Sequence, residues 1–312
     1  MKSLPTERIS TFAKFAWFTL AYNILVILWG VFLRASKSGD GCGQHWLTCH
    51  GEVIPSAPEL KTIIEFSHRM TTGPAFLFVL ILAIWAFRRF AKGHPARTTA
   101  MISLFFIVTE ALVGAGLVLT GNTAETITDA RPFWAIGHLL NTFTLLAFLA
   151  LTAWYASGDR VLSVAGRTKQ VVLIVLGVIA ILFVSTSGSV AALSNMLFPS
   201  ETLTEGIAKD FSAGSNILLR LRLSHPILSI VTSVYLIFLA GWLRSASDGN
   251  PDVTRWSNYL SILLLVQIAF GAATLLTLGP IVMQIGHLLL ADLIWISFVL
   301  LAANFLAKPS TA

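Results

Sequence analysis

Four histidines lie within long apolar segments of this 312-residue sequence. An ionisable side chain is costly in such surroundings, so it is functional by default. An internal repeat pairs His68 with His138 and His225 with His287. Paired histidines from facing helices of a bundle commonly bind haem iron from both sides. The pattern therefore predicts two haems, one in each half of the chain.

These histidines could also have roles that need no haem. Each ring could simply hydrogen-bond a neighbouring backbone or hydroxyl group, or the rings could form a proton relay. Zinc is disfavoured, because no cluster of Cys or carboxylate ligands accompanies either pair. The matched depth of all four rings in a repeat favours haem.

An acid accompanies only one of the two pairs. Glu65 precedes His68 by three positions, so both lie on one helix face, whereas the repeat places Arg222 at the equivalent position. A carboxylate near a pocket of low dielectric can transfer protons. We therefore expect chemistry at the first site, with Glu65 as the catalytic acid, and electron transfer at the second. The alternative is a glutamate at the lipid–water boundary that faces water.

The two cysteines of the sequence, Cys42 and Cys49, lie in the long segment 35–61. Outside the cytoplasm, a lone pair at this spacing predicts a disulfide. A redox role, or a metal site formed with His45 and His50, stays open. The remaining histidine, His94, lies in a loop on the opposite side of the membrane.

Three arginines are expected near the level of the paired histidines: Arg69, Arg220 and Arg222. A guanidinium group binds carboxylates in bidentate fashion, so these residues are candidate contacts for haem propionates. Ordinary snorkelling of the side chains to the membrane surface is the alternative.

Two further acids lie inside apolar segments. Glu110 aligns with Gln267 in the repeat, and we expect both side chains to hydrogen-bond across helices. Asp292 lies five residues beyond His287 and therefore not on its helix face. Neither acid is assigned to catalysis.

The elements that position these residues are predicted to be membrane-spanning helices. Apolar residues form 55% of the sequence and charged residues 12%, with a mean hydropathy of +0.79. A soluble domain has about twice this charged fraction. A helix needs roughly 20 apolar residues to cross a bilayer. Such runs occupy residues 15–34, 62–87, 98–120, 133–156, 170–191, 217–243, 257–278 and 281–306. The sequence therefore predicts an all-α integral membrane protein with eight spanning helices.

The positive charges indicate how these helices are oriented. If the N-terminus is inside, the inner segments hold 13 Lys and Arg against four acids. This asymmetry follows the positive-inside rule and predicts cytoplasmic termini. It also explains the net charge of +6 and the pI of about 9.6 without nucleic acid as a partner. The first apolar run is long enough to span and is followed by no signal-peptide cleavage site, so it is not expected to be a cleaved signal peptide. The segment before it is too short for an organelle transit peptide, which favours a bacterial plasma membrane over an organelle.

The repeat divides the chain into residues 1–157 and 158–312. Residues 66–68 and 110–115 align with 223–225 and 267–272 at an offset of 157, and residues 136–140 align with 285–289. Two four-helix bundles are thus predicted, related by a pseudo-twofold axis along the membrane normal. All four histidines then lie at similar depth in the outer leaflet.

Two motifs resemble those of the haem A synthase family. The loop GCGQHWLTCHG at residues 41–51 is similar to the cysteine loop of that family, and IEFSHR at residues 64–69 to its Glu-x-x-His-Arg element. The placement of His138, His225 and His287 also matches. The resemblance therefore covers essentially the whole chain.

The resemblance implies an oxidoreductase that converts haem O to haem A. The C8 methyl group would become a formyl group through two hydroxylations and loss of water. His68, His138 and Glu65 would serve the substrate haem, and His225 and His287 would bind a haem b cofactor. The family also implies a Cys42–Cys49 disulfide. Implied partners are a haem O synthase, a terminal oxidase and an unidentified electron acceptor.

The sequence departs from the family in two places. Many members have a second cysteine pair after the fifth helix, but residues 192–216 contain none, and members often have Gln where Glu110 stands. Two other functions remain: a b-type electron-transfer cytochrome, and a haem or small-molecule transporter. Electron transfer needs no acid such as Glu65, and a transporter more often has helices broken near the midplane.

Overall fold

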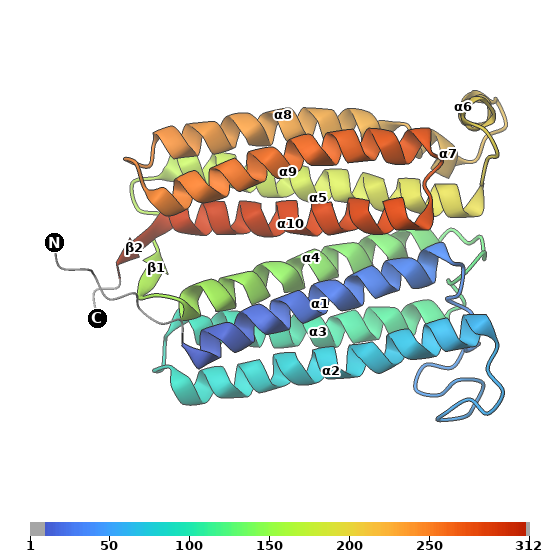
Figure 1. Cartoon of the computed structure of the whole chain (residues 1–312), viewed down its shortest axis with the longest axis horizontal. Helices are drawn as coiled ribbons and strands as arrows, with labels where there is room; N and C mark the ends of the chain where they lie inside the picture. Colours follow the sequence, from blue (N-terminus) through green and yellow to red (C-terminus); the bar gives the residue numbers. More distant parts are fainter. Residues whose placement is uncertain (1–9, 310–312) are drawn as a thin grey trace.

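The computed structural model describes residues 10–309 as a predominantly helical protein (Figure 1). Within these residues, eight helical spans are long and apolar enough to cross a membrane. They are α1 (Thr11–Ala35), α2 (Leu60–Arg89), α3 (Pro95–Leu119), α4 (Arg131–Ala156), α5 (Thr168–Leu197), α7 with α8 (Ile217–Arg222 and Ser224–Ser245), α9 (Pro251–Leu276) and α10 (Ile281–Leu306). The predicted all-α, multi-pass membrane fold is confirmed. Lys2 and Arg8, which support the predicted orientation, lie outside the described residues.

Side-chain caps fix several helix starts. Ser10 accepts a hydrogen bond from the backbone N–H of Ala13 at the start of α1. Asn250 caps α9 in the same way, and Pro251 follows at the first helical position, where its missing N–H costs nothing. These caps place the starts of α1 and α9 four and six residues before the apolar runs, which begin at residues 15 and 257.

Two further spans also differ from the predicted segments. The fifth was expected to end near residue 191, but α5 continues to Leu197. It tolerates its polar stretch because the hydroxyls of Thr186 and Ser187 donate to helix carbonyls one turn back, at 2.7 Å each. The sixth span is broken at Leu223 into α7 and α8. Pro226 lacks the N–H that would bond to the carbonyl four residues earlier, which explains the break.

Three small elements were not predicted. Helix α6 (Leu203–Phe211) lies in the segment between α5 and α7. Strands β1 (Arg160–Leu162) and β2 (Ala307–Pro309) pair antiparallel, with Arg160 opposite Pro309. Strands of three residues are too short to show an alternating pattern in a sequence. Their pairing joins the segment after α4 to the end of α10.

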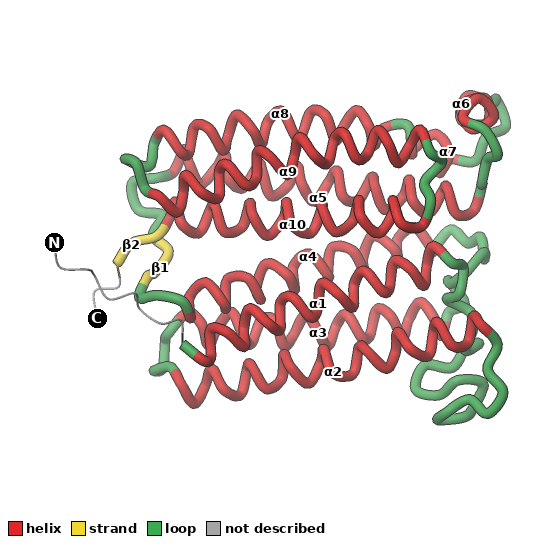
Figure 2. Tube along the Cα trace, in the orientation of Figure 1, coloured by secondary structure: helices red, strands yellow, loops and turns green. Residues whose placement is uncertain are grey.

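The spanning helices form two groups of four, one from α1–α4 and one from α5 and α8–α10 (Figures 1 and 2). In the first group, α2 and α4 each pack on α1 and α3, so α2 and α4 lie diagonally opposite. In the second group, α8 and α10 both pack on α9 and α5, and are diagonal likewise. The long loops gather at one end, which we call the outer end following the charge pattern. The pseudo-twofold axis and the division at residue 157 stay predictions.

The two groups meet where α4 packs on α10 and α5, and α1 packs on α10. The rings of Phe143 and Trp295 stack with centroids 5.7 Å apart, and Trp295 Nε1 donates to the Phe143 carbonyl at 2.6 Å. Nearer the inner end, the buried Asn304 Oδ1 accepts hydrogen bonds from Trp154 Nε1 at 3.1 Å and from Arg160 at 3.0 Å. One amide therefore links α4, β1 and α10.

We expect Asn304→Ala to destabilise the contact between the two groups. The substitution removes the acceptor of the buried Trp154 N–H, which costs about 1–3 kcal/mol. The midpoint of thermal unfolding in detergent should fall. Asn258→Ala is the control, because Asn258 is exposed and accepts only from Arg244 in the described residues. Equal midpoints for Asn304→Ala and Asn258→Ala would contradict this role.

Candidate functional site

The four predicted histidines come from the diagonal helices of each group. His68 is on α2 and His138 on α4, while His225 is on α8 and His287 on α10. All four are near the outer ends of their helices and partly buried. Diagonal helices face one another through the centre of a bundle, so each group can hold a ligand between two imidazoles.

The C-terminal pair has the spacing that a shared iron requires. The ring centroids of His225 and His287 are 6.2 Å apart, and the ring planes are 81° to each other. With metal–nitrogen bonds of about 2 Å on opposite sides of one ion, two imidazole centroids are roughly 6 Å apart. These two residues therefore fit the axial ligation of a haem.

A serine on α5 orients His225. Ser187 Oγ is 3.0 Å from His225 Nδ1 and donates its own hydrogen to the Val184 carbonyl. The hydroxyl oxygen is thus free to accept the Nδ1 hydrogen of the imidazole. That arrangement leaves Nε2 of His225 with a lone pair for a metal ligand bond.

His287 keeps one ring nitrogen without a partner. Gln267 Nε2 on α9 donates to the His287 carbonyl at 3.1 Å and lies 3.3 Å from His287 Nε2. Nδ1 of His287 is buried and bonds to no other described residue. A buried imidazole nitrogen without a partner is unusual, and a ligand would satisfy it.

The N-terminal pair has a carboxylate where the C-terminal pair has an amide. Glu110 Oε1 on α3 lies 3.0 Å from His138 Nδ1. The same carboxylate accepts hydrogen bonds from Asn141, at 2.5 Å, and from Thr142. Glu110 and Gln267 thus both bond across helices, as predicted. His68 Nδ1 is buried and has no partner within residues 10–309.

Three glycines, which the sequence reasoning missed, lie against the imidazoles. A Cβ atom at Gly188 of α5 would come within 2.8 Å of His225 Cε1, and one at Gly271 of α9 within 3.0 Å of His287 Cε1. Gly30 of α1 stands in the same relation to His68, at 3.2 Å. Each ring therefore occupies space that a side chain on the neighbouring helix would fill. Gly271 could have been suspected from the sequence, because it lies in a segment that the internal repeat aligns.

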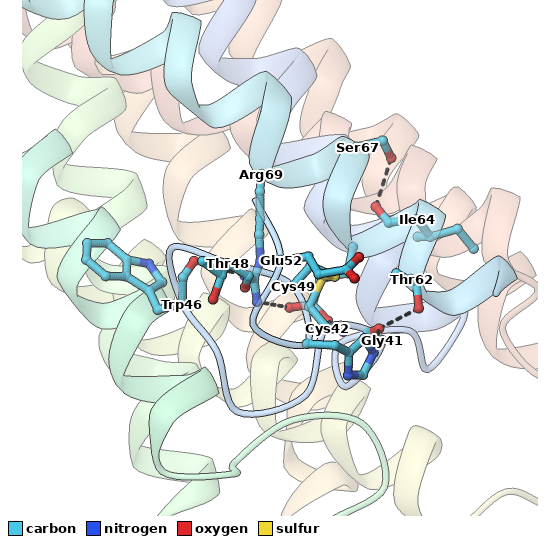
Figure 3. Close-up of a disulfide and its surroundings, with 12 residues drawn as sticks. Gly41, Cys42, Trp46, Thr48, Cys49, Glu52, Thr62, Ile64, Ser67 and Arg69 are labelled. Atoms are coloured by element: carbon cyan, nitrogen blue, oxygen red, sulfur yellow. Dashed lines mark hydrogen bonds and ion pairs between the residues drawn. A yellow bond between two sulfur atoms is a disulfide. The ribbon is translucent and has the colours of Figure 1, made fainter. Parts of the chain in front are cut away.

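The predicted disulfide between Cys42 and Cys49 is present (Figure 3). Among the described residues, no three His, Cys, Asp or Glu side chains cluster to hold a metal ion, so the alternative with His45 and His50 gains no support. His50 Nε2 instead bonds to the Gly41 carbonyl at 2.8 Å.

Glu65 is buried beneath the cysteine loop, which comprises residues 36–59. Only 3% of its surface is exposed, so the alternative that it faces water is wrong. Its Oε2 accepts from the Cys42 N–H at 2.9 Å, and its Oε1 pairs with Arg69. Arg69 also donates to the carbonyls of Trp46 and Thr48, both at 2.9 Å (Figure 3).

The other two candidate arginines contact the segment between α5 and α7. Arg222 pairs with Asp210 at 2.5 Å and donates to Asn195 at 2.8 Å. Arg220 donates to Ser215 and to the Ala213 carbonyl. All three arginines thus bind outer segments of this chain, and contact with haem propionates stays a prediction.

Two remaining titratable residues lie away from these pairs. Asp292 is fully buried in α10, and neither carboxyl oxygen has a partner in the described part of the chain. His94 caps α3 by accepting from the Ala96 N–H at 3.1 Å and stacks on Phe90. Burial lowers the pKa of the His94 imidazole, which suits this neutral, structural role.

Comparisons with known proteins identify relatives of this chain. The COX15-CtaA model, described as cytochrome oxidase assembly protein, matches residues 13–299. Heme A synthase of Shouchella clausii is 27% identical over 286 residues, covering 87% of this chain and 89% of that protein. Heme A synthase of Halalkalibacterium halodurans is 38% identical over 127 residues, 41% of this chain and 42% of that protein.

A longer relative has a different name. A protoheme IX farnesyltransferase of Thermus thermophilus is 45% identical over 305 residues, covering 98% of this chain and 50% of that protein. The chain thus spans about half the length of the Thermus relatives that it matches. Because the family model covers most of the sequence, the chain belongs to the heme A synthase family of cytochrome oxidase assembly proteins.

Proposed function

We propose that this chain is a haem A synthase, which oxidises the C8 methyl group of haem O to a formyl group. The observation that carries the proposal is the pair of diagonal imidazoles in each helix group, of which the C-terminal pair is 6.2 Å apart. Membership of the family and the relatives named heme A synthase support the same activity.

The C-terminal group would hold a resident haem b. His225 and His287 would hold its iron, and a bound haem b would supply one-electron transfer. Ser187 fixes the tautomer and the plane of His225 through the 3.0 Å hydrogen bond to Nδ1. Gly188 and Gly271 leave the space that the two rings occupy.

The N-terminal group would hold the substrate haem between His68 and His138. Glu110 orients the His138 ring from α3, and a carboxyl group at 3.0 Å from the imidazole can exchange a proton with it. The catalytic role predicted for Glu65 stays a prediction and is not part of this proposal, because both of its oxygens engage other groups. The loop variants described in the next subsection test that role.

The substrate would come from a haem O synthase. The Thermus relative named protoheme IX farnesyltransferase is twice as long as its match to this chain, which supports a link between the two activities. A terminal oxidase would receive the product. In this proposal the protein lies in a bacterial plasma membrane, with both termini in the cytoplasm.

Haem analysis of cells that make haem O but lack a haem A synthase tests the function. Expression of the chain should yield haem A in chromatography of the extracted haems. His68→Ala and His138→Ala should abolish haem A and leave haem b in the purified protein, whereas His225→Ala and His287→Ala should remove haem b. Bound haem b without any conversion of haem O would instead indicate an electron-transfer cytochrome.

Gly188→Ala tests the geometry of the cofactor site. The added methyl group lies within 2.8 Å of His225 Cε1 and must displace the ring. We expect haem b affinity to fall about tenfold or more, as on loss of a group that orients a metal ligand. Gly241→Ala on α8 is the matched control, since its Cβ would have no neighbour within 4 Å. Equal haem b content in the two variants would refute the inferred crowding.

A further inference from the structure

The carboxylate of Glu65 holds the cysteine loop on α2. One oxygen binds the Cys42 N–H at 2.9 Å, and the other pairs with Arg69 one turn further along the helix. Arg69 in turn binds the carbonyls of Trp46 and Thr48. The loop contacts of this pair all fall on residues 42–49, the ring that the disulfide closes. The ring is therefore attached to the helix as a unit.

The equivalent position in the second half performs the same task with the opposite charge. Arg222 precedes His225 by three residues, as Glu65 precedes His68. It pairs with the buried Asp210 of α6 at 2.5 Å and binds the Gly206 carbonyl at 3.2 Å. In both halves, the residue three positions before the first histidine thus fastens the outer segment to the helix. Glu65 does so through the Cys42 N–H and through Arg69 on its own helix, whereas Arg222 pairs directly with a carboxylate of the outer segment.

Burial makes these attachments strong. The exposed fractions of the Glu65 and Arg69 side chains are 4% and 19%. Removing one partner of a buried pair leaves an uncompensated charge and is strongly destabilising, whereas an exposed pair contributes little. On the same face of the protein, Lys61 and Asp40 form such an exposed pair at 3.4 Å.

We propose that Glu65 and Arg69 are positioning residues, which latch the disulfide-closed ring of residues 42–49 onto α2 within one turn of His68. The latch follows from the contacts alone. Its purpose, to keep the ring in place at the end of the substrate haem site, rests on the proposed function. In this account, Glu65→Ala stops haem A formation because the ring is displaced, and not because a proton donor is lost.

If Glu65 and Arg69 hold the ring on α2, replacing either residue should change the rate at which the disulfide is reduced. The full-length protein in detergent is treated with a phosphine reductant, and the released thiols are counted with a maleimide mass tag. Glu65→Ala and Arg69→Ala should accelerate reduction about tenfold or more, because the ring opens locally more often. Lys61→Ala, the matched control, should react like the wild type. A wild-type rate in Arg69→Ala would overturn the latch.

Conservative variants separate positioning from proton transfer. Glu65→Gln keeps an oxygen for the Cys42 N–H and loses the charge, and Arg69→Lys keeps the charge and loses the second donor nitrogen of the guanidinium group. In both variants the disulfide should be reduced at a rate between those of the wild type and the alanine variants. Among all these variants, the amount of haem A formed should fall as the reduction rate rises. If the disulfide of Glu65→Gln is fully protected from reduction but this variant forms no haem A, the positioning role is overturned and Glu65 is instead the catalytic acid.

The amounts of bound haem b and of haem A formed distinguish a failure of the latch from a failure of the proposed function. If every variant of Glu65 and Arg69 binds as much haem b as the wild type, the C-terminal group is folded. Faster reduction of the disulfide then reflects a local change at the ring of residues 42–49. If the wild-type chain makes no haem A but the variants still accelerate reduction as described, the latch stands and the proposed function fails.

Discussion

The arrangement of both helix groups depends on the need to satisfy imidazole rings that lie within membrane-spanning helices. Such a ring must be satisfied within the protein, because lipid offers no hydrogen-bond partners. The diagonal helices carry the rings, and the other two helices of each group supply what surrounds them. Ser187, Glu110 and Gln267 provide polar contacts, and three glycines provide space.

The two halves meet this constraint with different chemistry. His138 faces a carboxylate and His287 faces an amide at the aligned position. A carboxyl group beside a ring suits a site where protons move, whereas an amide suits a site that only holds a cofactor. This difference supports the proposed division between substrate and cofactor sites independently of Glu65.

Residue patterns were sufficient to predict the helices and the disulfide. Eight apolar runs, the repeat and two cysteines in one loop are local features, and each leaves a direct trace in the sequence. The contact of Glu110 across helices was also predictable, since an intramembrane acid needs a partner. The glycines could have been suspected only where the repeat aligned them, as at Gly271.

The features that could not be predicted depend on contacts between segments that are far apart in the sequence. Cys42, whose N–H binds Glu65, lies 23 residues earlier in the chain, and no spacing rule connects the two. The asymmetry of Glu65 and Arg222 was therefore interpreted as a sign of chemistry, although each contacts its own outer segment. The break at Leu223 was detectable, because Pro226 stands three residues later in an apolar run.

Titration of haem into haem-free, full-length protein tests the central claim most directly, with the low-spin absorption of bis-imidazole haem as the signal. The account predicts one such haem in each half, so His138→Ala and His287→Ala should each remove one of them, and the double variant should remove both. Low-spin haem that persists in the double variant would contradict the claim that these histidine pairs hold the haems.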